Sequence, residues 1–318
     1  MNSPANAQTT SRGRIYTRKG RNYWSVTTII KGGLPAPALM GWGMRSVAEY
    51  AVANHRQIAA MLGAVSLRRA EGRVEQSILD RLQAVFGAVR DDKPVPPVYV
   101  VSDPDAIAST VKWLSGAPYR ERDRKADVGT AVHEQIDAII LGKPRPVPGP
   151  DVAPYLAQFE RFIADLRPEF EASEGTVYSD AESYAGTLDW IALFRGEVVR
   201  RLGVDADMAR VLGDNKSGKA IYPEVALQLS AYRHADYIGL RDGTDAPLPE
   251  IHAGAALHLT PDGYALVPVR CDDEVFKAFL FTREVFRWAE EISKTVLGDP
   301  IGSAASEEPA SMPEGEAA

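Results

Sequence analysis

The spacing of apolar residues changes character about halfway along the chain. In the first half most of them recur every three or four positions, as on one face of an α-helix. This period predicts helices at residues 46–62, 105–114, 120–141 and 154–166, with a charged helical stretch that continues to about residue 89. Residues 16–30 are richer in β-branched and aromatic side chains, so one or two short strands are expected there.

The second half is rich in strand-forming residues. Residues 184–194 are apolar at both odd and even positions, which is typical of a central strand covered on both faces. Further strands are expected at 175–179 and 208–212, a hairpin at 253–259 and 264–269, and helices at 223–240 and 272–296. The predicted fold is α/β, with a mixed central sheet flanked by helices and preceded by a helical N-terminal part.

Composition divides the chain into four parts. Residues 1–11 and 298–318 are rich in Ser, Ala, Pro, Glu and Gly and are expected to be disordered tails, the second of them acidic. Residues 12–115 form an N-terminal part of strands and helices, interrupted by the proline-rich stretch 94–97. Residues 116–297 hold most of the predicted sheet and form the core domain.

Composition also excludes several classes of protein. The only cysteine, Cys271, cannot form a disulfide within the chain or supply a four-cysteine iron–sulfur cluster, and it fits a reducing compartment. No apolar run is long enough to cross a bilayer, and the polar first ten residues do not resemble a signal peptide. We therefore expect a cytoplasmic protein that does not act in a membrane.

Basic residues are concentrated near the N-terminus, although the net charge is −7. Seven of them precede the first acid, Glu49, and aromatic side chains lie between them. One interpretation is a surface that contacts nucleic-acid phosphates. The other, given equal weight, is a solvated strand pair with charged edges. The seven residues are Arg12, Arg14, Arg18, Lys19, Arg21, Lys31 and Arg45.

Asp214 and Lys216 follow an apolar strand in the segment Val-Leu-Gly-Asp-Asn-Lys at 211–216. Residues i and i+2 of a strand project from the same face, so these two side chains would be adjacent. The carboxylate can bind a divalent cation, and the ammonium can orient a water molecule or neutralise charge on a phosphate. On its own, so short a motif is more often a solvated turn.

A second acid, Asp189, lies inside the apolar strand 184–194. Burying a lone carboxylate is costly unless it is paired or bound to a metal. The alternative is an aspartate that caps a turn at a strand end. Together with Asp214 on a neighbouring strand, Asp189 would form a site of oxygen ligands for a hard cation.

Two helices supply weaker candidates. Gly129 and His133 are one turn apart on the helix 120–141, where a glycine suggests that another part of the protein packs close to the backbone. A lone helical histidine is more often structural than a ligand. Gln228 and Tyr232 share a face of the helix 223–240, and both can donate a hydrogen bond to a phosphate.

In this order, the motifs Gly129/His133, Gly186/Asp189, Asp214/Lys216 and Gln228/Tyr232 resemble the RecB-like branch of the PD-(D/E)xK nuclease superfamily. That branch includes phage exonucleases and CRISPR-associated nucleases with an iron–sulfur cluster. The resemblance covers roughly residues 120–240. It implies a restriction-endonuclease-like core and Mg²⁺- or Mn²⁺-dependent cleavage of DNA by a phage-type exonuclease, in recombination, repair or phage replication. No cluster is expected, because its four cysteines are missing.

The resemblance also implies a role for each motif residue. Asp189 and Asp214 would ligate the metal, and Lys216 would position the attacking water. Glu174 matches an acid found at the corresponding place in related sequences. Residues 195–207 lengthen the interval between the two aspartates and are expected to protrude as a hairpin or loop. Further metal ligands would be His133 and the Asn215 carbonyl. The residues that would contact DNA or order the site are Gln228, Tyr232, Ser217 and Lys219.

Two other functions are compatible with parts of the sequence. Residues 213–219 nearly spell the phosphate-binding loop of an NTPase, but Ala220 replaces the hydroxyl that would hold Mg²⁺, and Pro223 delays the following helix. A catalytically silent DNA-binding recombination partner is the third reading, and the retained acids argue against it. Some relatives form rings or act with helicases, but no motif here specifies a homo-oligomer or a partner protein.

Overall fold

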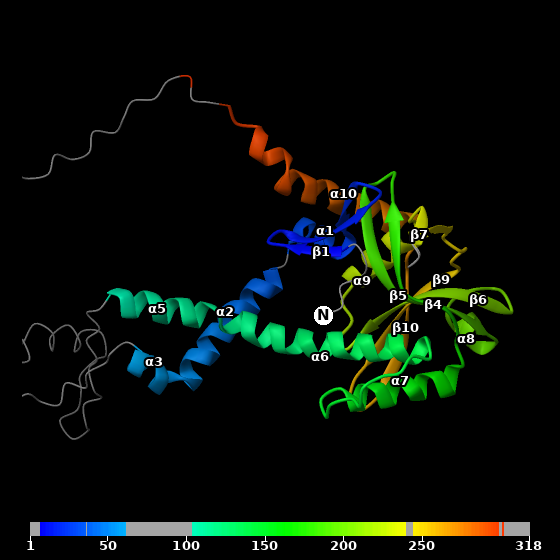
Figure 1. Ribbon diagram of the computed structural model, residues 1–318, viewed down its shortest axis with the longest axis horizontal. Coiled ribbons are helices and arrows are strands. Elements are labelled where there is room, and N and C mark those ends of the chain that lie inside the picture. The colour runs from blue at the N-terminus through cyan, green and yellow to red at the C-terminus, as the bar shows by residue number, and fades with distance from the viewer. Residues whose placement is uncertain (1–6, 36, 62–103, 240–243, 299–300, 302–318) are drawn as a thin grey trace, which may run out of the picture. The chain divides into compact units, whose positions relative to one another are not determined.

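The computed structural model describes residues 7–35, 37–61, 104–239, 244–298 and 301 (Figure 1). The chain divides into two compact units. One contains Met1–Pro35 and His133–Ala318, and the other contains Ala36–Val132. The division differs from the expected boundary near residue 116, because the N-terminal strands belong to the same unit as the central sheet.

The unit Ala36–Val132 is helical in its described residues. It comprises α2 (Pro37–Ala53), α3 (His55–Met61), α5 (Pro104–Ser115) and the first part of α6 (Ala117–Ile140). The rings of Tyr50 and Trp113 lie 5.0 Å apart, and the Arg120 guanidinium stacks on both. The helix expected at 46–62 is instead two helices that meet at Asn54, whose side-chain amide donates to the Tyr50 carbonyl. The stretches expected at 62–89 and 94–97 lie outside the described residues.

The other unit is built on a sheet that forks at β5 (Figure 1). One path runs β1-β2-β3-β5-β4-β7-β8, and the second leaves β5 through β6 to β9 and β10. The described strands are β1 (Ala7–Thr10), β2 (Gly13–Arg18), β3 (Arg21–Ser25), β4 (Glu169–Ser179), β5 (Tyr184–Arg195), β6 (Met208–Lys216), β7 (Tyr237–Gly239), β8 (Asp245–Pro247), β9 (Ala253–Leu259) and β10 (Tyr264–Val269).

The fork arises because two strands share one edge of β5. Tyr184 and Ala185 pair in parallel with β3, whereas residues 190–195 pair antiparallel with β6. β4 occupies the opposite edge along nearly the whole strand. Residues 186–189 therefore face the gap between β3 and β6. A gap in pairing at the middle of a sheet exposes backbone and side chains to whatever fills it.

Helices cover both faces of this sheet. α1 (Val26–Gly33), α9 (Glu224–Arg233) and α10 (Asp273–Glu290) share one apolar core with the sheet residues Leu188 and Leu212. α7 (Ala153–Leu166) packs on the other face, where its Phe162 ring lies 6.2 Å from Trp190. The expected α/β class, with a mixed sheet and flanking helices, is confirmed. The hairpin β9–β10 and the central position of β5 also agree with the expectation.

Several element boundaries differ from the sequence prediction. Residues 26–30 were expected to be extended but begin α1, because Val26, Ile29, Ile30 and Gly33 form one apolar helical face that is buried against α10. The helix expected at 223–240 ends at Arg233, and β7 follows. The last helix ends at Glu290, with a 3₁₀ turn at Ile292–Thr295.

Two segments expected to be irregular have regular structure. Residues 7–10, within the predicted N-terminal tail, form β1 by pairing with β2. Composition alone does not identify such an edge strand, because its hydrogen-bond partner decides whether it is ordered. The insertion at 195–207 contains the short helix α8 (Glu197–Arg201), which is anchored by the buried Val199. Residues 302–318, the greater part of the expected acidic tail, lie outside the described residues.

Candidate metal centre

The fork of the sheet brings the two strand acids together. Asp189 is the last residue of β5 before β6 joins the strand, and Asp214 lies near the end of β6, beyond the last β5–β6 pair at Trp190 and Gly213. Beyond that pair β6 remains paired with β9 but no longer pairs with β5. The two carboxylates therefore stand on either side of a diverging pair of strands.

Asp189 is held by one backbone and one side-chain contact. Its Oδ2 accepts a hydrogen bond of 2.6 Å from the backbone N–H of Asn215. The same oxygen lies 3.4 Å from His133 Nδ1, which reaches the site from α6. His133 Nε2 lies 3.2 Å from the Asn215 carbonyl oxygen. His133, Asp189 and Asn215 thus form one connected group.

Glu174 completes a possible metal site. It lies on β4 between the pairs Ser173–Trp190 and Gly175–Leu188, and so faces Asp189 across the strand pair. Its backbone φ of 51° is left-handed, which is uncommon for a residue other than glycine. One ligand atom from each of His133, Glu174 and Asp189 lies within 4.8 Å of the other two, so these three side chains could hold a metal ion.

Asp214 belongs to a second, adjoining group. Its side chain is only 3% exposed, and its Oδ2 lies 2.6 Å from Lys216 Nζ. Its Oδ1 accepts a hydrogen bond of 2.7 Å from Gln228 Nε2. The prediction that Asp214 and Lys216 project from one face of the strand is confirmed by this ion pair. Gln228 Oε1 is also 3.4 Å from Lys216 Nζ, so one amide positions both charged groups.

Tyr232 packs next to Gln228 in this second group. Its hydroxyl lies 3.3 Å from Gln228 Nε2, and the residue is only 3% exposed. The ring occupies the space beside Gly186, where an added Cβ would stand 2.4 Å from Tyr232 Cε1. The glycine of the Gly-x-x-Asp motif is therefore required by the close approach of α9 to β5. Tyr232 is placed to order the site rather than to stack on a base.

The electrostatics of the centre show an excess of buried negative charge. Burial, followed by the charge of Asp189, raises the pKa of Glu174 to about 7 and the pKa of Asp214 to about 6. Burial opposes the charged form of His133, but the carboxylates, Asp189 foremost, outweigh it and raise its pKa to about 9. The burial of Asp189 is likewise outweighed, here by His133, and its pKa is lowered.

This arrangement could hold a metal ion. The two carboxylates and the imidazole of His133, Glu174 and Asp189 are ligand types that divalent metals accept. The Oδ2 atom of Asp214 is buried and takes no hydrogen bond of good geometry among the described residues, although Lys216 lies close. The Lys216 ammonium, 2.6 Å away, balances the charge of this oxygen.

Sequence reasoning missed the group that fixes Asn215. The Trp190 indole Nε1 donates a 3.0 Å hydrogen bond to Asn215 Oδ1, and its ring lies directly over Gly213. An added Cβ at Gly213 would stand 2.0 Å from that ring. Trp190 therefore holds the Asn215 side chain on its own side. The backbone N–H of Asn215 contacts Asp189, and the backbone carbonyl of Asn215 contacts His133. The neighbouring apolar residues suggested only a core role for Trp190.

Ser217 and Lys219 do not join the centre. Ser217 is half-buried and Lys219 exposed in the segment after β6, and within the described contacts neither side chain bonds to the acids. Residues 213–216 are extended strand, and α9 begins only at Glu224. The segment is therefore not folded as a phosphate-cradling loop at a helix N-terminus, which removes the structural basis of the NTPase alternative.

Part of the basic N-terminal segment has structural partners. Arg18 is 6% exposed and bonds to the Thr244 carbonyl and to Asp245, and Lys19 donates to the same carboxylate. Arg21 donates to the Asp180 carbonyl and the Ser183 hydroxyl. Arg18 is therefore not part of an exposed surface, and Lys19 and Arg21 have partners within the protein.

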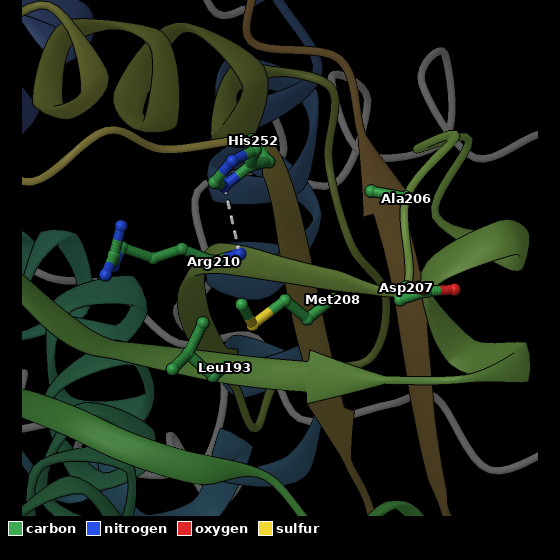
Figure 2. A pocket seen from close by; sticks show the side chains of 6 residues that line it. All are labelled: Leu193, Ala206, Asp207, Met208, Arg210 and His252. Atoms are coloured by element: carbon green, nitrogen blue, oxygen red, sulfur yellow. Dashed lines mark hydrogen bonds between the residues drawn. The ribbon is translucent and has the colours of Figure 1, made fainter.

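A hollow of about 420 Å³ lies elsewhere on the same unit (Figure 2). Leu193, which lines it, is four residues beyond Asp189 on β5, or roughly 13 Å along the strand. The polar groups there are engaged, since the Arg210 backbone N–H donates to His252 Nδ1 and the Arg210 guanidinium binds Glu171. This hollow offers no acid–base pair comparable to the centre at the fork.

The fold and the site define an α/β protein with a mixed sheet and a part-buried cluster of histidine and acidic residues that could bind a metal. Comparison with known proteins found no matching family model and no curated protein of significant similarity. None of the described helices is both long enough and apolar enough to cross a membrane. With a single cysteine, the chain lacks the ligands for a four-cysteine cluster.

Proposed function

We propose that this protein is a metal-dependent deoxyribonuclease of the RecB-like branch of the PD-(D/E)xK superfamily, and that it acts as an exonuclease. One observation carries the proposal: residues from four separate motifs, spread over about a hundred positions, lie together in a part-buried cluster at the fork of the sheet. Surface aspartates and lysines that match a motif by chance would have no reason to meet there.

Each side chain has a defined task in this proposal. His133, Glu174 and Asp189 would hold a divalent cation, with Asp214 and the Asn215 carbonyl beside them. When bound, Mg²⁺ or Mn²⁺ supplies positive charge to the phosphate oxygens. Lys216, which is 32% exposed, can present its ammonium to a water molecule or to the phosphate.

Gln228 determines where the ammonium of Lys216 stands. Its amide nitrogen donates to Asp214, and its amide oxygen lies near Lys216 Nζ, so one side chain fixes the spacing of carboxylate and ammonium. Tyr232 in turn limits the movement of Gln228. Such prior ordering matters because charge stabilisation is strongest when the groups need not rearrange during the reaction.

The proposal is tested by offering the purified protein linear duplex, closed circular duplex and single-stranded DNA with Mg²⁺, Mn²⁺ or EDTA. We expect cutting of linear but not closed circular duplex, and none in EDTA. Asp214→Asn and Lys216→Ala should abolish cutting while far-UV circular dichroism stays unchanged.

The matched control is Asp262→Asn, which removes a carboxylate from the exposed turn between β9 and β10. This variant should cut like the wild type. Undiminished cutting by both Asp214→Asn and Lys216→Ala would refute the assignment. Tight DNA binding by a wild type that cuts nothing under any condition would instead favour the silent recombination partner.

A further inference from the structure

The basic residues at the N-terminus form two groups with different surroundings. Those at the β2–β3 turn, Arg18, Lys19 and Arg21, are bound to partners within the protein. Arg12 and Arg14, at the β1–β2 end of the same ribbon, are exposed, and no described residue pairs with either guanidinium. Among the described residues of this ribbon, these two guanidinium groups are therefore open to an external anion.

The strand directions place Arg14 on the side of Tyr16 that lies towards the metal centre. Tyr16 hydroxyl lies 3.0 Å from Thr187 Oγ1, which ties β2 to β5 across β3. β2 runs antiparallel to β3, and β3 runs parallel to β5, so going back along β2 corresponds to going forward along β5. Arg14 is two residues back from Tyr16, and Asp189 is two residues on from Thr187. Both steps run in the same direction and measure about 7 Å. The registers set Ile15 opposite Trp24 and Trp24 opposite Tyr184, so the backbone of Arg14 lies short of Asp189 along the sheet, and its long side chain must span the difference.

Arg14 also lies on the correct face of the sheet. Alternate residues of a strand share a face, so Arg14 is on the face of Tyr16 and Asp189 on the face of Thr187. The contact between Tyr16 and Thr187 shows that these faces are one.

The strand order leaves room between this arginine and the acids. β3 lies between β2 and β5, at a strand spacing of about 4.8 Å, and it pairs with β5 only as far as Ala185. Among the described residues no ion pair joins Arg14 to Glu174 or Asp189. A phosphate held beside the acids would find a free guanidinium at the rim.

We propose that Arg14 binds a backbone phosphate of the DNA strand next to the one at the metal centre, with Arg12 at the hairpin tip contacting the strand further out. The proposal rests on the nuclease function above and names the path of the strand, which runs from the fork of the sheet over the β1–β2 hairpin. A planar guanidinium suits this task because it can donate two parallel hydrogen bonds to a phosphate.

The test measures binding of a short fluorescently labelled DNA duplex in EDTA over a series of salt concentrations. Arg14→Gln should weaken binding about tenfold, the loss expected for one charged hydrogen-bonding contact. It should also reduce the slope of log affinity against log salt by about one, as for one lost phosphate contact. Arg14→Lys keeps the positive charge but loses the planar guanidinium. It should therefore restore the salt slope but only part of the affinity.

The control is Arg201→Gln, an exposed arginine on α8 that lies beyond the far end of β5. It changes the net charge equally and should leave affinity and slope near wild-type values. The inference is overturned, with the nuclease proposal intact, if the wild type cuts DNA but Arg14→Gln keeps its salt slope, or if Arg201→Gln causes an equal loss. A wild type that neither binds nor cuts DNA overturns both.

Discussion

Replacing Gly186 with alanine tests whether the glycine of the Gly-x-x-Asp motif is needed because α9 packs directly against β5. The new methyl group would stand 2.4 Å from Tyr232 Cε1 and 3.0 Å from its hydroxyl oxygen. Carbon atoms in contact are normally 3.5 Å or more apart. The buried ring must therefore move by about 1 Å or rotate, and its hydrogen-bonding position beside Gln228 is lost.

The size of the effect follows from the burial of the ring. Forcing an extra methyl group into a well-packed core typically costs about 1–3 kcal/mol. Gly186 is not in a left-handed conformation, so the whole loss in the free energy of unfolding should come from the collision with Tyr232. Gly263→Ala, where an added Cβ meets nothing within 4 Å, should change stability by less than about 0.5 kcal/mol.

The assay is a double-mutant cycle followed by urea denaturation and circular dichroism. Tyr232→Leu removes the atoms that would collide while keeping an apolar side chain. In that background Gly186→Ala should be nearly neutral, which gives a coupling free energy of about 1–3 kcal/mol. An equal loss of stability from Gly186→Ala with and without the tyrosine ring would refute this account of the glycine.

Two further predictions concern the metal ligand and the acid stability of the sheet. His133→Ala should weaken binding of Mn²⁺, measured by calorimetric titration, much more than it lowers the melting temperature. An unchanged titration with a sharply lower melting temperature would make His133 structural. Hydrogen bonds from Lys19 and Arg18 lower the pKa of Asp245 in the folded protein. The ionised carboxylate therefore stabilises the fold fully above its unfolded pKa of about 3.9. This contribution to the free energy of unfolding is lost as the pH falls through the lower, folded pKa. Asp245→Asn should therefore reduce the free energy of unfolding at pH 7 but not at about pH 2, and an equal reduction at both would contradict the role of its charge.

Local patterns in the sequence were sufficient to predict contacts between residues close together in the chain. The period of two in a strand predicted that Asp214 and Lys216 would be neighbours, and the period of a helix predicted that Gln228 and Tyr232 would share a face. Both pairs are in contact. These are short-range consequences of backbone geometry, which do not depend on the rest of the fold.

Contacts between distant segments could not be predicted in the same way. Glu174 faces Asp189 only because of the register of β4 on β5, and its left-handed backbone has no sequence signature. Arg18 and Arg14 look equivalent in the sequence. Arg18 is buried because distant residues surround it, Asp245 by a hydrogen bond and Tyr178 by its ring, whereas Arg14 is exposed. Pairing partners of this kind are decided by the whole sheet.

The same limit applies to Val26–Gly33, where β-branched residues suggested a strand. Their apolar positions also fit one face of a helix, and burial of that face against α10 decides between the two. At Gly33 the helices approach so closely that an added Cβ would lie 2.2 Å from the Thr282 carbonyl oxygen. Tertiary packing thus overrides the local preference of the chain.

The most direct test of the central claim is an anomalous-scattering map from crystals of the protein grown with Mn²⁺. The account predicts a peak among the side chains of His133, Glu174 and Asp189, adjoining Asp214 at the fork of the sheet. A map with no peak there, under conditions in which the protein cuts DNA with Mn²⁺, would contradict it.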